Sequence, residues 1–313
     1  MTYTAVPPSA SPPGSRTPVP LRLAAVHRRG FDPAEAADGS LSAGDRAFYT
    51  DLVTAGGLPV DEEAFTGGRT TYAAMVSAML PELAPRDDFD LALLAHATPD
   101  ATPGWPLSRL ERSATRTGLA FAISDQGATS PFAALRMAVN GIAVREARRA
   151  LVLIPEQRAV YHRGPIPGEL RARHDTAVAL TLDVSGELGA LDCHHHSGVA
   201  PADVPGRLAA QAPPAGAGTS RPVLIAGAGL TRHRGAAPDG FEVRTVPDGM
   251  PATGIWWELA GQLADPRRAD RTILLADYDA RRGYLGLCRL DVAADAAAER
   301  TGADRQGKRT HVG

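Results

Sequence analysis

The sequence predicts an α/β protein in which helices cover both faces of the sheet. Short apolar runs bounded by turn residues alternate with longer segments whose apolar residues recur at helical spacing. The same order of strand, helix and strand occurs in both halves of the 313-residue chain, and no Gly/Ser-rich linker lies near residue 160. We therefore expect one fused unit with two similar halves; two independent domains are the alternative.

The expected elements follow from these patterns in chain order. Strands are expected at 21–26, 90–95, 119–124, 150–155, 176–184, 187–196, 222–226, 271–276 and 284–291. Helices are expected at 45–55, 70–83, 107–117, 131–147 and 254–263. The strand at 187–196 is expected to run antiparallel to the strand that precedes it, as its continuation.

Both ends of the chain have the composition of flexible tails. Residues 1–20 are rich in Pro, Ser and Thr, and residues 293–313 are rich in Ala and polar residues, so neither segment can bury much apolar surface. We expect the two halves of the folded part to be 21–160 and 161–292.

Composition excludes several classes of protein. Hydrophobic residues make up 44% and charged residues 22% of the chain, as in soluble globular proteins. The formal net charge of −2 provides no general attraction for nucleic acid. No apolar run is long enough to cross a membrane, and no secretion signal is evident. We expect a cytoplasmic protein in which Cys193 and Cys288 form no disulfide framework.

Several sequence motifs occur in an order and spacing typical of one enzyme family. They are DLALLAHATPD at 90–100, AFAI at 120–123, SDQGATSPFAAL at 124–135, ALVLIPEQ at 150–157, HDTAVALTL at 174–182 and the segment 251–290. Together they cover about 200 residues and resemble the ketoacyl synthase III branch of the thiolase-like condensing enzymes. The resemblance implies a thiolase-like layered αβαβα fold with two pseudo-duplicated halves, normally dimeric.

The catalytic Cys, His and Asn of that family have no counterparts here. The place of the Cys, at the start of the buried helix, falls on Gly127 or Ala128. The place of the Asn falls on Ala252, and the segment where the His is expected reads Gly-Ala-Gly at 227–229. The only asparagine, Asn140, lies in the middle of the expected helix at 131–147 and cannot substitute. Ordinary decarboxylative condensation is therefore not expected.

Other departures define the candidate catalytic groups. A glycine-rich turn of the family is replaced by Asp-Ala-Arg-Arg at 279–282. Asp125 could act as a base, and Gln126 could line or block an acyl tunnel, as a Gln does in the chain-length-factor subunits of type II polyketide synthases. Both could equally be polar turn residues. Ser130 precedes a proline, which favours a capping role over a nucleophile, and His233 is a further candidate.

The resemblance also suggests residues for binding. Those expected to line a substrate site are Gly127, Ala128, Thr253, Gly254 and Trp257. Of the adjacent Trp256 and Trp257, one is expected in the core and the other at the cavity or a subunit contact, and the sequence does not distinguish them. Arg109, Arg112 and Arg116 recur at helical spacing and could dock an acidic acyl carrier protein, or form a solvated face. His194 and His196 would share one face of a strand and could ligate zinc, but no second ligand pair is evident, so a surface role is favoured. We expect no metal and no cofactor.

Two functions from different classes follow. The first is a catalytically silent subunit that forms a homodimer, or a heterodimer with a Cys-containing ketosynthase, and handles acyl chains on acyl carrier protein or CoA in polyketide or fatty-acyl metabolism. The second is an acyltransferase or thioester hydrolase that uses Asp125, Gln126 and His233 in place of a Cys. A small-molecule binding protein is a third possibility.

Overall fold

The computed structural model describes most of the chain between residues 22 and 292. The described ranges are 22–32, 41–83, 88–104, 106–108, 117–145, 148–213, 221–233, 237–265 and 271–292. The expected tails at 1–20 and 293–313, and most of the expected helix at 107–117, lie outside these ranges.

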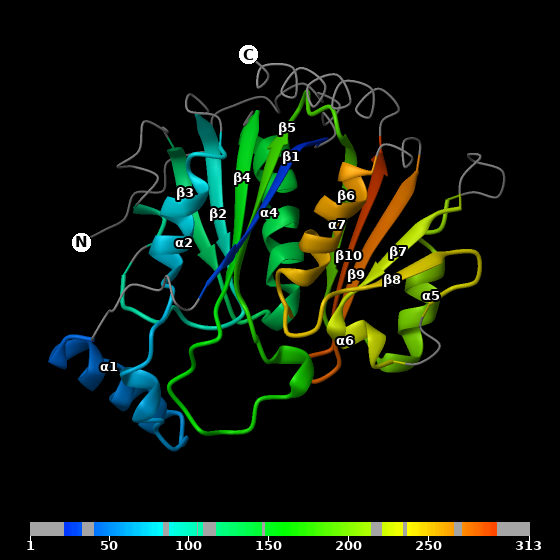
Figure 1. The fold of residues 1–313 in the computed structure, drawn as a ribbon. Helices are drawn as coiled ribbons and strands as arrows, with labels where there is room; N and C mark the ends of the chain where they lie inside the picture. The colour runs from blue at the N-terminus through cyan, green and yellow to red at the C-terminus, as the bar shows by residue number, and fades with distance from the viewer. Residues whose placement is uncertain are drawn as a thin grey trace, which may run out of the picture.

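Ten strands form a mixed sheet that runs through the molecule (Figure 1). Their order is β3-β2-β4-β5-β1-β6-β10-β9-β7-β8. The strands are β1 (Arg22–Phe31), β2 (Phe89–Ala95), β3 (Thr117–Ile123), β4 (Arg149–Glu156), β5 (Asp175–Asp183), β6 (Gly189–His196), β7 (Val223–Ala226), β8 (Glu242–Thr245), β9 (Thr272–Asp279) and β10 (Tyr284–Val292).

The pairing pattern of the sheet is duplicated. In the first five strands, β2 is parallel to β3 and β4, and β5 is antiparallel to β4 and β1. In the last five, β7 is parallel to β8 and β9, and β10 is antiparallel to β9 and β6. Each strand therefore has a counterpart five strands later, which confirms the expected pseudo-duplication.

The prediction that β6 continues from β5 as an antiparallel strand is wrong. Both strands pair antiparallel with β1, so they run in the same direction, and the chain crosses the start of β1 between them. Leu188 N donates to Leu23 O at 2.9 Å in this crossing. A Cβ on Gly186 would lie 2.7 Å from the same carbonyl oxygen, so the crossing needs a glycine there. This segment links the two halves of the sheet.

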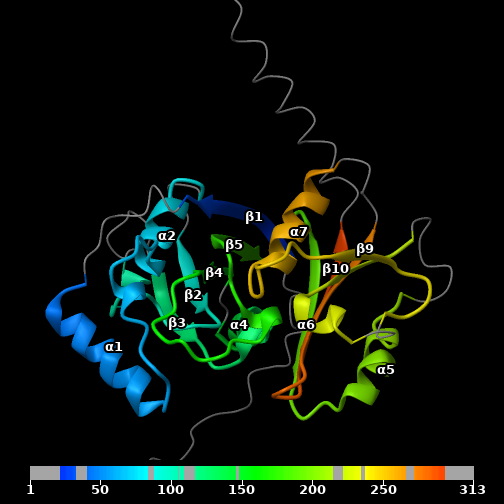
Figure 2. The same ribbon diagram turned by 60° about the horizontal axis from the view of Figure 1, so that its bottom comes forward.

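Helices form the layers around the sheet. The α-helices are α1 (Ala43–Ala55), α2 (Tyr72–Met79), α4 (Ser130–Arg145), α5 (Val204–Ala209), α6 (Ala228–Thr231) and α7 (Gly254–Ala264). Helix α4 contacts β2 and β4 of one half and β6 and β10 of the other, and α7 contacts β1 and β7. Both helices therefore lie between the two halves (Figure 2), whereas α2 and α5 cover the outer faces.

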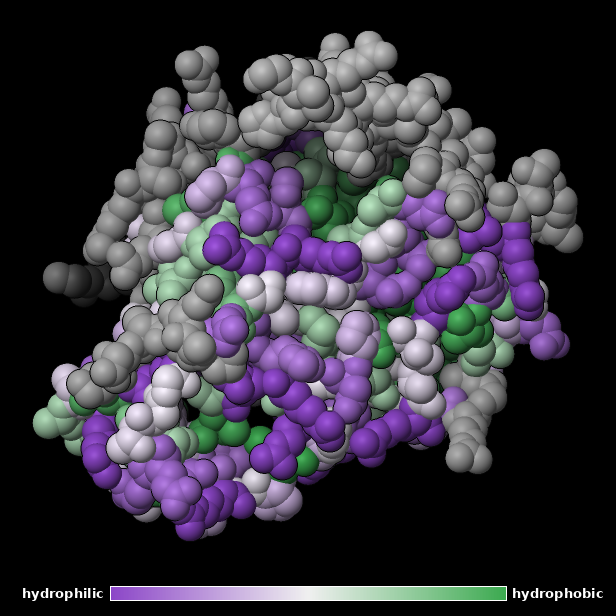
Figure 3. Space-filling view, viewed as in Figure 1, coloured by the Kyte–Doolittle hydropathy of each residue, from purple (hydrophilic) through white to green (hydrophobic). Residues whose placement is uncertain are grey.

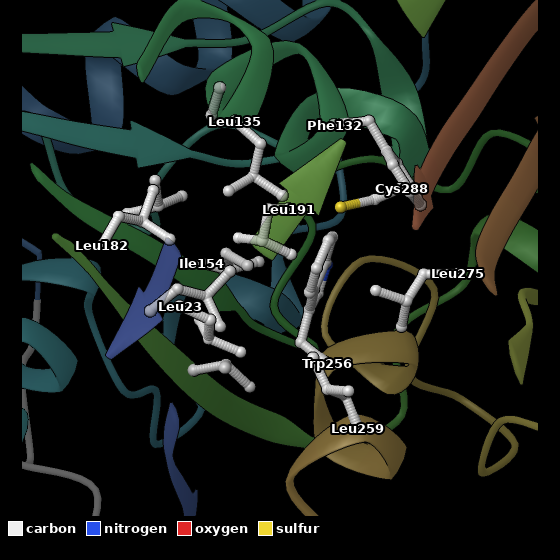
Figure 4. Close-up of a cluster of buried hydrophobic side chains, with 14 of the residues drawn as sticks. Leu23, Phe132, Leu135, Ile154, Leu182, Leu191, Trp256, Leu259, Leu275 and Cys288 are labelled. Carbon is white, nitrogen blue, oxygen red and sulfur yellow. The ribbon is translucent and has the colours of Figure 1, made fainter. Parts of the chain in front are cut away.

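Successive side chains of a strand point to opposite faces of the sheet, and this alternation explains the layering. In β2, Leu91 and Leu93 belong to the central core around α4, whereas Ala92 and Leu94 pack with α2. The central core is joined across the halves by Phe132 of α4 and Trp256 of α7, whose ring centroids lie 5.3 Å apart (Figure 4). No described helix has the length and apolarity needed to cross a bilayer.

Candidate functional site

A tight turn joins β3 to the buried helix α4. Asp125 has φ 64° and Gly127 has φ 55°, both in the left-handed region that non-glycine residues seldom adopt. The turn continues through a short 3-10 helix, Gly127–Thr129, whose residues are buried. The resemblance expects a nucleophile in this turn, at Gly127 or Ala128, and neither residue has a reactive side chain.

The space beside Gly127 is occupied by a carboxylate from the other half of the chain. A Cβ on Gly127 would lie 2.8 Å from Asp279 Oδ2 and 3.3 Å from Arg282 Nη1. The Asp279 side chain is almost fully buried at the end of β9, and its Oδ2 accepts from Arg282 Nη1 at 2.7 Å. Its Oδ1 accepts from the backbone N–H groups of Arg281 and Arg282. The ion pair therefore fills the space into which a side chain at position 127 would extend.

A second carboxyl group stands beside Gly227, in the segment expected to carry the family's His. A Cβ on Gly227 would lie 2.5 Å and 2.6 Å from the two carboxylate oxygens of Asp277. Asp277 Oδ1 accepts from Leu230 N at 2.9 Å and Tyr278 N at 2.8 Å. Burial raises the pKa of Asp277 to about 6, although hydrogen bonds from the Leu230, Tyr278 and Gly229 backbone act against the shift.

A third carboxyl group lies at Ala252, the place of the family's Asn. Glu156, at the end of β4, accepts from Ala252 N at 2.7 Å, Thr253 N at 3.2 Å and Thr253 Oγ1 at 2.6 Å. These bonds satisfy free N–H groups at the start of α7. Burial raises the pKa of Glu156 to about 7, against the opposing effect of the same hydrogen bonds.

Positions 127, 227 and 252, which the resemblance matches to the family's catalytic residues, are small residues, each with a buried carboxyl group against it. Asp279 and Glu156 end β9 and β4, which are counterparts in the duplicated sheet. The two groups stand at the starts of α4 and α7 respectively. Carboxyl groups at helix N-termini compensate the positive end of the helix dipole.

The hydroxyl groups at the start of α4 are committed to the backbone. Ser130 Oγ donates to Gly127 O at 2.8 Å, and Ser130 is the first residue of α4, not the N-cap residue that the sequence predicted. Thr129 Oγ1 donates to Gln126 O at 2.7 Å and lies 3.1 Å from His195 Nε2. Because a hydroxyl has one proton, His195 must be the donor in the second contact. His195 therefore does not activate Thr129 as a base.

A cavity of about 610 Å³ lies on the outer side of Gly127. Its walls come from α1, from the loop that follows β2, from the loop 159–167 that follows β4, and from the turn between β9 and β10. A separate cavity of about 50 Å³ lies on the other side of the same turn, lined by Ala128, His233 and Asp277 among others.

Comparison with known proteins places the fold. No protein-family model and no curated protein sequence matches the chain, but solved structures do. ChlB3, an acyltransferase, has a TM-score of 0.58 at 14% identity over 89% of this chain and 99% of its own. The priming β-ketosynthase of the R1128 polyketide pathway has a TM-score of 0.56 at 14% identity, over 90% and 99%. The 3-oxoacyl-(acyl carrier protein) synthase III of Pseudomonas aeruginosa PAO1 has a TM-score of 0.51 at 16% identity, over 88% and 98%.

The chain has the thiolase-like fold of the ketoacyl synthase III proteins. At these identities the likeness concerns the fold, and it confirms the layered architecture expected from the sequence motifs. Within the thiolase-like fold, the small residues at 127, 227 and 252 lie on the elements that the motifs indicated: the start of α4, the end of β7 and the start of α7.

The thiolase-like fold brings some of the expected site residues together and separates others. Ala128 and His233 line the same small cavity, and the His233 ring packs edge-on against Tyr278 at 4.9 Å. Asp125 is exposed, and its carboxylate accepts from Ser124 Oγ at 3.2 Å. Gln126 is half-buried and contributes its carbonyl to the turn.

The remaining expected residues lie elsewhere. Thr253 is bonded to Glu156, and Gly254 begins α7 behind it. The guanidinium carbon of Arg28, on β1, lies 4.9 Å from the centre of the Trp257 ring. Trp257 lines none of the cavities described among the residues that the structure places. Arg109, Arg112 and Arg116 lie outside the described residues.

The histidine run occupies the half-buried C-terminal end of β6. His194 and His196 stack at 5.9 Å on one face, as the strand period predicts. His194 Nε2 is 3.0 Å from Asp192 Oδ1, and Arg207 Nη1 is 3.4 Å from His196 Nδ1. Among the described residues, no group of three or more potential ligands is arranged to hold a metal ion.

Sequence reasoning did not identify the carboxyl groups that fill the site. Asp277 and Asp279 flank Tyr278 at the end of an apolar strand, which gives no local sign that they contact Gly227 and Gly127, far earlier in the chain. The one sequence feature that pointed to these carboxyl groups was the replacement of a glycine-rich turn by Asp-Ala-Arg-Arg at 279–282. That Asp279 lies against Gly127 is evident only from the folded structure.

Proposed function

We propose that this protein is a catalytically silent, ketosynthase-III-like subunit that acts with an active condensing enzyme or an acyl carrier protein. Acyl chains of fatty acid or polyketide metabolism are the proposed cargo. The same fold in a priming β-ketosynthase and an acyltransferase supports the metabolic context.

One observation carries the proposal: the Asp279 carboxylate stands 2.8 Å from where a Gly127 side chain would begin. A condensing enzyme needs a thiolate at the start of the buried helix, with donors around the developing oxyanion. Here position 127 has neither a thiol nor space for one, because the Asp279–Arg282 ion pair lies against it. The retained 610 Å³ cavity beside it supports a binding role.

The edge strand β3 supports a subunit role. Among the described residues, β3 pairs with β2 alone. Phe121 is 38% exposed, although it shares a strand face with Leu119 and Ile123, which pack toward the central core. Met137 of α4, the helix that packs beside β3, is 42% exposed. Exposed apolar residues on an open sheet edge favour association with another chain.

The test combines assembly with turnover. The protein is co-expressed with a Cys-containing condensing enzyme of the same source, and the mass of the purified complex is measured. We expect a heterodimer that Phe121→Asp disrupts and that Val243→Asp leaves intact, because Val243 is 45% exposed on the opposite edge strand, β8. A protein that forms only homodimers and turns over thioesters alone would overturn the proposal.

The second candidate is an acyltransferase or thioester hydrolase. It is favoured by the shared small cavity of Ala128, His233 and Asp277, which gathers a histidine and a carboxyl group beside the start of α4. Loss of thioester hydrolysis in Asp277→Asn and His233→Ala would support it, and loss in Asp125→Ala would add the turn carboxylate to the catalytic groups. Hydrolysis that none of these substitutions reduces would remove these residues as its catalytic groups.

A further inference from the structure

The cavity of about 610 Å³ has an apolar wall and a charged end. Leu52 and Leu58, on and just after α1, lie opposite Val160 and Ile166 of the loop that follows β4. Figure 3 shows the surface hollowed between α1 and this loop, with hydrophobic residues around the opening. Its size is ordinary for a site that binds a small molecule.

Two arginines from the turn between β9 and β10 form the charged end, near Gly127. Arg282 is neutralised by the buried Asp279 at 2.7 Å. The Arg281 guanidinium has no hydrogen-bond or ion-pair partner among the residues that the structure describes; its backbone N–H binds Asp279. Arg281 is exposed, so at this end of the cavity its charge faces solvent and pairs with no carboxylate of the described residues.

Two other ionisable groups of the lining do not compensate that charge. The Asp100 carboxylate accepts backbone N–H bonds from Tyr72, at 2.9 Å, and from Ala101 and Thr102, so it is held by its own surroundings. The His162 Nδ1 accepts from Gly164 N at 3.1 Å. Neither group is bonded to Arg281.

We propose that this cavity binds an aliphatic carboxylic acid as the free anion, with the chain between α1 and the loop 159–167 and the carboxylate on Arg281. A guanidinium binds a carboxylate through two parallel N–H donors, whereas the neutral carbonyl of a thioester gains much less from the same group. The inference rests on the proposed function, since a subunit without a nucleophile binds acyl chains without processing them. It specifies a free acid as the ligand.

The experiment compares octanoate with octanamide by isothermal titration calorimetry on the full chain. The two probes have the same chain and differ in the charge of the head group. We expect the dissociation constant of octanoate to be about tenfold lower than that of octanamide, after discounting for the exposure of Arg281. Arg281→Gln should raise the octanoate constant about tenfold and leave that of octanamide unchanged.

Arg207→Gln is the matched control, because Arg207 lies on α5 and lines none of the described cavities. Equal affinity for the two probes, no effect of Arg281→Gln, or binding of neither probe would each overturn the inference. The heterodimer measurement above is independent of these results, so the proposed function can fail or stand separately from the ligand class.

Discussion

The close approach of Asp279 to Gly127 predicts a large cost for adding a single methyl group. In Gly127→Ala, the new Cβ would lie 2.8 Å from Asp279 Oδ2 and 3.3 Å from Arg282 Nη1, and the backbone must keep φ near 55°. The left-handed backbone costs an L-residue about 1–2 kcal/mol. Displacing the buried ion pair adds about 1–3 kcal/mol, as overpacking does in cores. We expect the free energy of unfolding to fall by about 2–5 kcal/mol.

The assay is urea unfolding at pH 8, followed by tryptophan fluorescence. Gly57→Ala is the matched control, because Gly57 has φ 69° and its Cβ would meet nothing within 4 Å. It should cost only the backbone strain, about 1–2 kcal/mol. In an Asp279→Ala background, the cost of Gly127→Ala should fall toward that of the control.

The double-mutant cycle therefore predicts a coupling free energy of about 1–3 kcal/mol between positions 127 and 279. A cost for Gly127→Ala equal to that of Gly57→Ala would refute the reasoning. An unchanged cost in the Asp279→Ala background would refute it too, because the carboxylate would then not occupy the space in question.

Three further predictions follow from the buried carboxyl groups. Gly227→Ala should destabilise by about 2 kcal/mol or more, because its Cβ meets the Asp277 carboxylate, whereas Gly206→Ala in α5, with open space around it, should be neutral or stabilising by urea unfolding. Burial raises the pKa of Glu156 in the folded chain from 4.5 to about 7. Because the folded chain then binds this proton more tightly than the unfolded chain, the free energy of unfolding should fall as pH rises from 5 to 8. The expected decrease from this group is about 3 kcal/mol. Glu156→Gln should flatten that profile and exposed Glu62→Gln should not; a slope unchanged by Glu156→Gln would contradict the assignment. Asp277, with its pKa raised from 3.8 to about 6, acts in the same direction, so Asp277→Asn should reduce the part of the slope below pH 7.

Most of the fold could be predicted from the sequence because its strands are buried on both faces. Runs such as 150–155 and 271–276 are mostly apolar, and both become strands. β4 extends the first run by one residue at each end, whereas β9 begins one residue later than the second run and ends three residues later. Ser130 and Pro131 marked the start of α4 within one residue. β8, α5 and α6 were not anticipated, since each is only four to six residues long.

The direction of β6 and the content of the site could not be predicted. Residues 184–188 have the turn composition of a hairpin, and only the presence of β1 between β5 and β6 turns them into a crossing. The small residues at 127, 227 and 252 were visible as departures from a family pattern. That carboxyl groups fill the resulting space depends on contacts such as that between Gly127 and Asp279, which lie far apart in the chain.

The central claim is that the start of α4 cannot form an acyl-enzyme. It is tested most directly by intact-protein mass spectrometry after incubation with octanoyl-CoA and with an acyl carrier protein thioester, while thioester loss is followed in parallel. We predict an unchanged protein mass and no thioester loss above the rate without protein. An acyl adduct on Ser130 or any other residue, or loss of thioester that scales with protein concentration, would contradict the account.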